Sequence, residues 1–175
     1  MKKAMILIDI QNDYFPGGKC ELYQADQAAA IAAAALEDSR KSGDEVIFIQ
    51  HINQDINAPF FCEGTEGCEI HDSVKPLRSE KIIIKRRPNS FYETELKDYL
   101  ESKGITELYI CGMMSHMCID STVRAAKDLG YTVNLIENAC TTRDLSLNGE
   151  VYPAKIVHNI FMAALNGKFV ELCKL

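Results

Sequence analysis

The sequence lacks the features that mark export, membrane insertion and structural zinc. No apolar run approaches the ~18 residues of a membrane-spanning helix. The run "AMILI" near the start is shorter than the roughly 7–15 apolar residues at the centre of a signal peptide. The seven cysteines include no C-x-x-C pair, the spacing typical of zinc sites. We therefore expect a cytoplasmic protein with reduced thiols.

Excess positive charge is also missing. The 175 residues include 19 Lys and Arg against 25 Asp and Glu, for a net charge of −6. This balance does not favour binding to nucleic acid or to an anionic membrane. Hydrophobic residues make up 47% of the chain, as in ordinary globular proteins. We expect residues 1–175 to form one domain.

Short apolar runs alternate with helical patterns along the chain. The runs predict strands at 3–10, 45–52, 81–86, 107–112, 131–138 and 168–175. The patterns between them predict helices at 25–43, 90–104, 115–130 and 151–167. Ser90 and Glu93 fit a capping box at the start of the second helix. Strands rich in Ile, Val and Leu that alternate with helices predict a six-stranded parallel sheet in a three-layer, Rossmann-like α/β/α fold.

Polar side chains gather where the predicted strands end, the edge at which ligands bind in such folds. They are Asp9, Gln11, Asn12 and Asp13 after the first strand, Gln50, His51 and Asn53 at the second, Lys85, Arg86 and Arg87 at the third, and Cys118 after the fourth. Residues 53–75 form a long loop beside them, and long loops in compact domains are often functional.

Three of these residues form a set with chemical meaning. A nearby cation such as Lys85 and a helix start both favour the thiolate of Cys118, the reactive form of a cysteine. Asp9 could move protons between the thiol and a leaving amine. Each residue also has a structural interpretation, as a buried cysteine, a capping aspartate or a solvated lysine.

Four segments carry a family resemblance. They are "ILIDIQNDYFPGG", "GTEGCEIH", "KRRPNSFYETEL" and "GMMSHMCIDSTVRAAKDLGY". In this order and spacing, the chain resembles the isochorismatase-like cysteine hydrolases, which include nicotinamidases and N-carbamoylsarcosine amidohydrolase. The resemblance covers nearly the whole chain. It implies the same six-stranded α/β/α fold and a homo-oligomer, such as a dimer or a tetramer.

The resemblance also implies roles for single residues. Asp9, Lys85 and Cys118 match the catalytic triad of the family. The Met113–Met114 peptide bond matches a cis bond, so that the backbone amides of Met114 and Cys118 would form an oxyanion hole.

The expected pocket wall is aromatic. Phe15, His51 and Tyr92 are the candidates for substrate binding, and Phe60 and Phe61 of the long loop are further ones. Aromatic residues at these positions could equally be ordinary core packing.

Nicotinamidases of this family carry a metal on a D-x-H motif after the second strand. Here Ile49 takes the place of the acid, which leaves His51 and the distant His71. Two histidines without the carboxylate are a poor ligand set, so we expect no metal and no cofactor.

The expected activity is hydrolysis of a C–N bond in a small amide, ureide or carbamoyl compound through an acyl-cysteine intermediate. One alternative is an isochorismatase-type vinyl-ether hydrolase, although that subgroup lacks the cysteine. Another is a catalytically silent binding protein on the same fold. A flavin-binding module is disfavoured, because Asp9 and Asp13 would repel a phosphate group.

Overall fold

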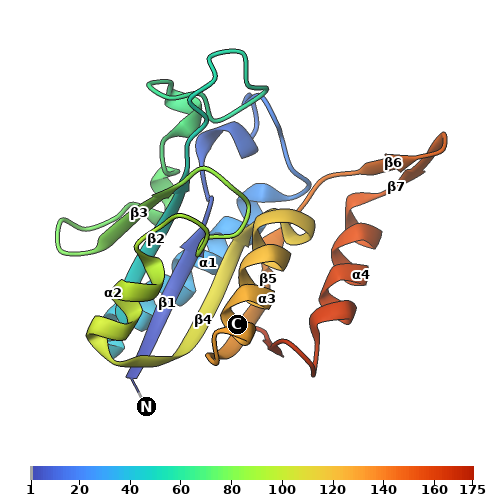
Figure 1. Cartoon of the computed structure of the whole chain (residues 1–175). Coiled ribbons are helices and arrows are strands. Elements are labelled where there is room, and N and C mark those ends of the chain that lie inside the picture. The colour runs from blue at the N-terminus through green and yellow to red at the C-terminus, as the bar shows by residue number, and fades with distance from the viewer. Residues whose placement is uncertain (1) are drawn as a thin grey trace.

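A six-stranded, wholly parallel sheet forms the centre of the protein, as the computed structural model of residues 2–175 shows (Figure 1). Its strand order is β3-β2-β1-β4-β5-β8, and every neighbouring pair is parallel. The strands are β1 (Lys2–Ile8), β2 (Glu45–His51), β3 (Lys81–Lys85), β4 (Ile105–Met113), β5 (Thr132–Thr141) and β8 (Glu171–Cys173). The predicted fold class is therefore confirmed.

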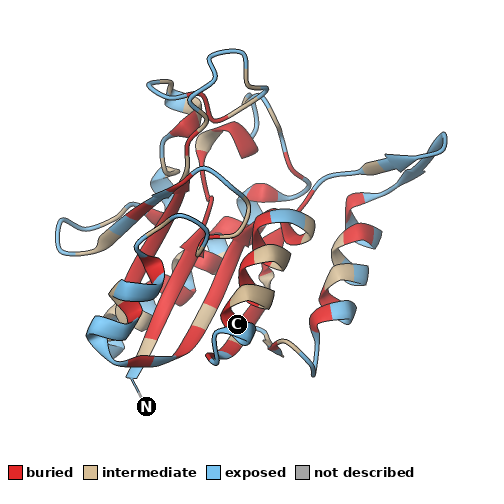
Figure 2. Cartoon of the chain, in the orientation of Figure 1, coloured by how far each residue is buried: buried red, intermediate tan, exposed pale blue. Residues whose placement is uncertain are grey.

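Helices cover the sheet on both faces. They are α1 (Ala25–Ser42), α2 (Leu96–Lys103), α3 (Asp120–Asp128) and α4 (Ala154–Leu165). In Figure 1, α1 lies behind the sheet, α2 and α3 lie in front of it, and α4 stands beside β5. The central strands are buried along most of their length (Figure 2). Such burial explains why their sequences are almost continuously apolar.

The predicted helix 90–104 begins later than the capping box indicated. Helix α2 starts at Leu96, and Glu93 takes a left-handed φ of 54°. Ser90 is fully buried, and its amide and hydroxyl lie 3.0 and 2.9 Å from the Thr122 hydroxyl. The serine thus ties the loop after β3 to α3 and caps no helix, so this prediction was wrong.

The observed boundaries of the other helices differ from the predicted ones by a few residues. The segment 115–130 divides into a π-helical turn, Ser115–Ile119, followed by α3. Residues 145–152 form an unpredicted antiparallel hairpin of β6 (Leu145–Leu147) and β7 (Glu150–Tyr152) ahead of α4. The long loop 53–75 contains two short 3-10 turns, Glu66–Cys68 and Asp72–Val74.

Within residues 2–175, no helix is both long and apolar enough to cross a membrane. All seven cysteines are unpaired. The cytoplasmic location stays a prediction.

Gly112 allows the two central strands to approach at the point where the strand order reverses. A Cβ atom at this position would lie 2.0 Å from the carbonyl oxygen of Ile8, and the φ of Gly112 is 130°. A side chain would therefore clash with backbone and strain the residue's own conformation. Because Ile8 precedes Asp9, this close contact also fixes the end of β1.

We predict that Gly112→Ala lowers the free energy of unfolding by about 2–5 kcal/mol, since strain and a backbone clash add. Urea denaturation followed by circular dichroism measures the change. Gly43→Ala is the matched control. Gly43 also has a positive φ, of 73°, but open space around it, so we expect a loss of about 1 kcal/mol. Equal losses in the two variants would contradict the role of the close contact.

Candidate active site

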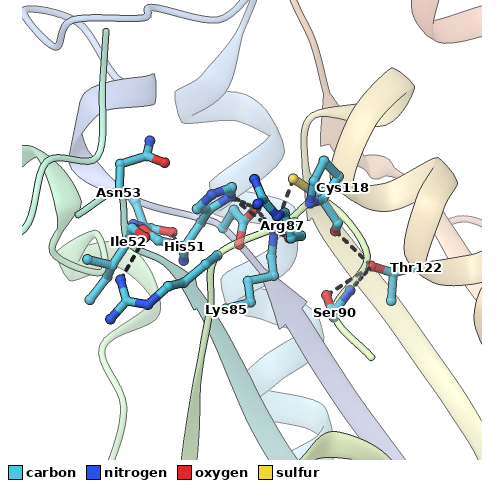
Figure 3. A network of polar contacts seen from close by, with 12 residues as sticks. His51, Ile52, Asn53, Lys85, Arg87, Ser90, Cys118 and Thr122 are labelled. Carbon is cyan, nitrogen blue, oxygen red and sulfur yellow. Dashed lines mark hydrogen bonds and ion pairs between the residues drawn. The ribbon is translucent and has the colours of Figure 1, made fainter. Parts of the chain in front are cut away.

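Three side chains from separate strand ends meet in one buried cluster (Figure 3). Asp9 follows β1, Lys85 ends β3, and Cys118 lies in the π-helical turn after β4. The Nζ atom of Lys85 lies 2.7 Å from Asp9 Oδ2 and 3.1 Å from Cys118 Sγ. Each of the three residues is at most 3% exposed. A carboxylate, an ammonium group and a thiol are thus held within direct reach of one another, away from water.

The Lys85 ammonium has two further neighbours. It donates to the backbone carbonyl of Arg87 at 3.2 Å and lies 3.3 Å from Nδ1 of His51. Burial lowers the pKa of Lys85, but Asp9 and the Cys118 sulfur raise it, and the net change is upward. The lysine therefore stays charged although it is buried, because its neighbours stabilise the cation.

Asp9 keeps unused capacity to accept a proton. Its Oδ2 atom faces the Lys85 ammonium as an ion pair, yet neither carboxylate oxygen accepts a hydrogen bond of favourable geometry from the described residues. Its backbone has a left-handed φ of 52°, which turns the chain at the strand end, and its amide donates to the Ile49 carbonyl at 3.0 Å. A buried carboxylate that keeps one oxygen, here Oδ1, without a donor can take the proton of a neighbouring thiol.

The pKa of Cys118 is raised, opposite to the effect expected from a nearby cation and a helix start. Burial is the largest cause, because it penalises the anion, and the Asp9 carboxylate raises the pKa further. The Lys85 ammonium lowers the pKa but does not offset these two effects. Desolvation and the nearby negative charge therefore keep the sulfur protonated at neutral pH. The thiol requires a base to react, and Asp9 is the adjacent one.

The turn that carries Cys118 has an unusual hydrogen-bond pattern. The amides of Met117 and Ile119 both donate to the Met114 carbonyl, at 3.0 and 3.2 Å, whereas the amide of Cys118 between them does not. The Met113–Met114 peptide bond is cis. A π-helical turn widens the local backbone and is frequent at functional sites. The Cys118 amide is thus free of the Met114 carbonyl, in the residue that carries the thiol of the cluster.

His51 is the predicted binding residue that the structure brings to the cluster. Burial lowers its pKa, Asp9 raises the pKa and Lys85 lowers it, with a net decrease. The ring is therefore uncharged at neutral pH, and its Nδ1 atom can accept a hydrogen bond from the Lys85 ammonium. The side chain is 12% exposed, more than those of Asp9 and Lys85, so it lies on the solvent side of the ion pair.

An aromatic group extends from His51 toward the long loop. Phe61 lies 6.0 Å from His51 and 4.5 Å from Tyr14 between ring centroids, and Phe60 lies 5.0 Å from Phe61. Tyr14 was missed in the sequence, where Phe15 beside it was chosen instead. Burial, Cys118 and Asp9 all raise the pKa of Tyr14. Tyr14 is therefore close enough to the cluster for the charges of Cys118 and Asp9 to affect its hydroxyl group.

Phe15 and Tyr92 lie elsewhere. Phe15 stacks on His71, with ring centroids 3.6 Å apart, and both line a cavity of about 450 Å³ that Asp9, Lys85 and Cys118 do not reach. Tyr92 is 52% exposed, in the loop between β3 and α2. Their roles in substrate binding stay predictions.

Two polar residues after β1 hold the long loop in place. Gln11 donates to the carbonyls of His51 and Cys68 and accepts from the His51 amide, at 2.7 to 2.8 Å. The buried Asp13 carboxylate accepts from the Phe61 amide at 2.7 Å. Gln11 and Asp13 thus have structural roles, and they set the position of the aromatic group. The sequence marked both residues as polar strand-end positions but could not identify their partners.

The donor atoms of Asp9, His51 and Cys118 lie within 4.8 Å of one another, a spacing that could hold a metal ion. However, the Lys85 ammonium lies within 3.3 Å of an atom from each of them. A protein cation thus already supplies positive charge to these donors. His71 does not join them, since its Nδ1 accepts from the Ser73 amide at 3.3 Å.

Comparison with known proteins identifies relatives of the whole chain. Residues 3–151 match the isochorismatase domain. An uncharacterized isochorismatase family protein of Bacillus subtilis, YddQ, is 49% identical over 98% of this chain and 96% of its own length. The ureidoacrylate amidohydrolase RutB of Caulobacter segnis is 25% identical over 78% of this chain and 71% of its own length. A solved structure from Oleispira antarctica is 41% identical and superposes with a TM-score of 0.96, over 99% of this chain and 93% of the other.

We predict opposite effects of two variants on alkylation of Cys118 by iodoacetamide at about pH 8. Asp9→Asn should accelerate the reaction, because it removes the charge that raises the pKa of the thiol and leaves Lys85 in place. Lys85→Met should slow it. Mass spectrometry of the Cys118 peptide gives the rates, with half-buried Cys173 as the internal reference.

In the unmodified protein, the alkylation rate should continue to rise through about pH 9, since the thiolate fraction grows until the raised pKa is reached. A rate that levels off near neutral pH would show that the thiolate is already present at rest.

Proposed function

Since the chain belongs to the isochorismatase family, a family that includes amidohydrolases, we propose that it is a cysteine hydrolase that cleaves a C–N bond in a small amide, ureide or carbamoyl compound. One observation carries the proposal. Lys85 lies 2.7 Å from a carboxylate and 3.1 Å from a thiol, in a cluster at the carboxyl ends of parallel strands. A buried charged set of this kind is costly to maintain, and such sets concentrate at functional sites.

The first half-reaction forms an acyl-cysteine. Asp9 takes the proton of the Cys118 thiol as the sulfur attacks the carbonyl carbon of the substrate. The Lys85 ammonium stabilises the negative charge that develops on the sulfur during this transfer. When the tetrahedral intermediate collapses, the C–N bond breaks and the amine leaves with the proton that Asp9 held. The products of this step are a thioester on Cys118 and a free amine or ammonia.

The second half-reaction restores the enzyme. Asp9 takes a proton from a water molecule, whose oxygen attacks the thioester carbonyl carbon. The C–S bond then breaks, and the sulfur regains its proton from Asp9. Across both steps one water is consumed and one amide becomes an acid and an amine. Asp9 thus acts alternately as base and acid, for which its free carboxylate oxygen is suited.

The oxyanion of each tetrahedral intermediate needs hydrogen-bond donors. We assign this role to the backbone amides of Met114 and Cys118. In support, the Cys118 amide does not donate to the Met114 carbonyl, unlike those of Met117 and Ile119. A preorganised donor of this kind typically accelerates acyl transfer by about 10²–10³-fold.

The nature of the substrate follows from the nucleophile. A thiol supports acyl transfer, whereas hydrolysis of a vinyl ether does not require one, so Cys118 favours C–N cleavage over the vinyl-ether alternative. His51 and the aromatic group of Tyr14, Phe60 and Phe61 offer flat surfaces for a small planar ligand.

We predict that a screen of small amides and ureides, with ammonia release as the readout, yields a substrate, and that Cys118→Ala abolishes its turnover. Cys173→Ala is the matched control and should keep full activity, because Cys173 lies in β8 outside the cluster. Hydrolysis that survives in Cys118→Ala would contradict the acyl-cysteine. Turnover of isochorismate alone would favour the vinyl-ether alternative, and no turnover of either class would favour the silent binding protein.

We further propose that the protein is a homo-oligomer and that α4 with the β6–β7 hairpin forms its interface. The hairpin projects away from the body of the molecule (Figure 1). The exposed apolar residues of this segment are Leu147, Val151 and Tyr152 in the hairpin, and Ile156 and Ile160, four residues apart, on α4. Lys155 is the sole charged residue of α4 and Glu150 that of the hairpin strands, so apolar side chains predominate and suit an equally apolar partner. A second copy offers the same face across a two-fold axis.

We predict that Ile156→Glu combined with Ile160→Glu lowers the molar mass in light scattering to that of one chain, because a buried unpaired charge opposes association. Leu77→Glu, an equally exposed site in the loop between β2 and β3, should leave the mass unchanged. If the unmodified protein is already a monomer, the interface does not exist.

A further inference from the structure

The turn that carries the nucleophile is tied to α4 by one side-chain pair. Ser115 begins this turn, directly after Met114 and three residues before Cys118. Its Oγ atom lies 2.7 Å from Nδ1 of His158, which comes from the first half of α4. The two residues are 43 positions apart in the sequence. The pair therefore connects the proposed catalytic turn to the helix that stands beside the sheet (Figure 1).

Burial makes this hydrogen bond hard to replace. Ser115 is 0% exposed, so its hydroxyl depends on a partner within the protein. Breaking such a pair leaves a buried polar group unsatisfied, which costs more than the bond itself contributes. Burial also lowers the pKa of His158, although Glu137 raises it. The ring is thus uncharged at neutral pH, and one of its nitrogens can accept from the serine hydroxyl.

A second histidine holds the same turn from another direction. Nδ1 of His116 lies 2.5 Å from Oγ1 of Thr142, the fully buried residue that follows β5. Consecutive residues of the turn are thus fastened to two different elements, Ser115 to α4 and His116 to the end of β5. Neither pair belongs to the Asp9–Lys85–Cys118 cluster, and the proposed mechanism uses neither of them.

The position of these bonds gives them a consequence for chemistry. The amides assigned to the oxyanion flank Ser115, at Met114 before it and Cys118 after it. A displacement of about 1 Å at such donors can cost about 10²-fold in rate, because their contribution depends on fixed geometry. Any movement of Ser115 would shift both amides relative to the substrate carbonyl.

We propose that His158 is a positioning residue. Through its hydrogen bond to Ser115, it holds the backbone amides of Met114 and Cys118 in the positions that bind the oxyanion. The proposal rests on the proposed function and adds a residue that touches no reacting atom. Helix α4 thereby becomes part of the catalytic apparatus, although the triad lies entirely on the other elements.

The test compares two substitutions of one residue. His158→Leu removes the hydrogen bond, whereas His158→Asn places an amide group near the position of Nδ1 and can keep it. With an amide substrate, we expect kcat to fall about 10–100-fold in His158→Leu, with KM changed by less than about threefold, and to recover most of this loss in His158→Asn. Lys97→Leu, at an exposed position of α2 outside the proposed interface, is the control and should retain full kcat.

Two further measurements separate positioning from loss of structure. The rate at which iodoacetamide alkylates Cys118 should stay within about twofold in His158→Leu, because alkylation forms no oxyanion. The double variant His158→Leu with Ser115→Ala should have a kcat no lower than that of the slower single variant, since both substitutions remove the same hydrogen bond. A parallel fall in alkylation and kcat, or additive effects of the two substitutions, would overturn the proposal.

Hydrogen exchange tests the anchoring role of His158 without a substrate. In His158→Leu, the amides of residues 114–119 should exchange faster than in the unmodified protein, and His158→Asn should restore their protection. Unchanged exchange would overturn the anchoring role even if an amidase activity is found. Conversely, if the unmodified protein hydrolyses no amide, the proposed function fails, while the exchange data still decide whether His158 holds the turn.

Discussion

The structure depends on keeping one ammonium group charged in a place that water does not reach. Burying an isolated charge costs much free energy of desolvation. An ion pair offsets that cost if its geometry is good and its remaining donors and acceptors are hydrogen-bonded. Lys85 meets these conditions through Asp9, the Cys118 sulfur, His51 and the Arg87 carbonyl. The same neighbours determine its chemistry, because the cation opposes but does not overcome the effects that keep the thiol protonated.

The parallel sheet makes this arrangement possible. Its strand order places the end of β1 beside β4 on one side and beside β2 on the other, with β3 next to β2. Residues that follow these strands therefore face a common edge, where side chains far apart in the sequence can meet. Close approach of β1 and β4 requires a glycine at 112, and Gln11 joins the end of β1 to that of β2. Fold stability and site geometry thus rest on the same few contacts.

The turn that carries Cys118, the proposed nucleophile, is also held by residues outside the Asp9–Lys85–Cys118 cluster. This turn departs from α-helical hydrogen bonding, which frees the Cys118 amide from the Met114 carbonyl, and such a turn needs external restraint. Ser115 and His116 supply it through partners on α4 and after β5. Elements that contribute no group to the cluster therefore help to set its geometry, because the position of a backbone amide depends on everything packed around it.

The sequence by itself determined the alternation of strands and helices, since apolar periodicity is a local property, and it marked the strand ends where Asp9, Lys85 and Cys118 would lie. The tertiary structure alone decided which residues meet and with what effect. It directed Ser90 to a buried bond with Thr122 in place of a helix cap. It turned Phe15 toward His71, and it raised the pKa of Cys118 where the neighbouring lysine had indicated the opposite. Each of these outcomes depends on distances and burial set by segments far apart in the chain, which no local pattern encodes.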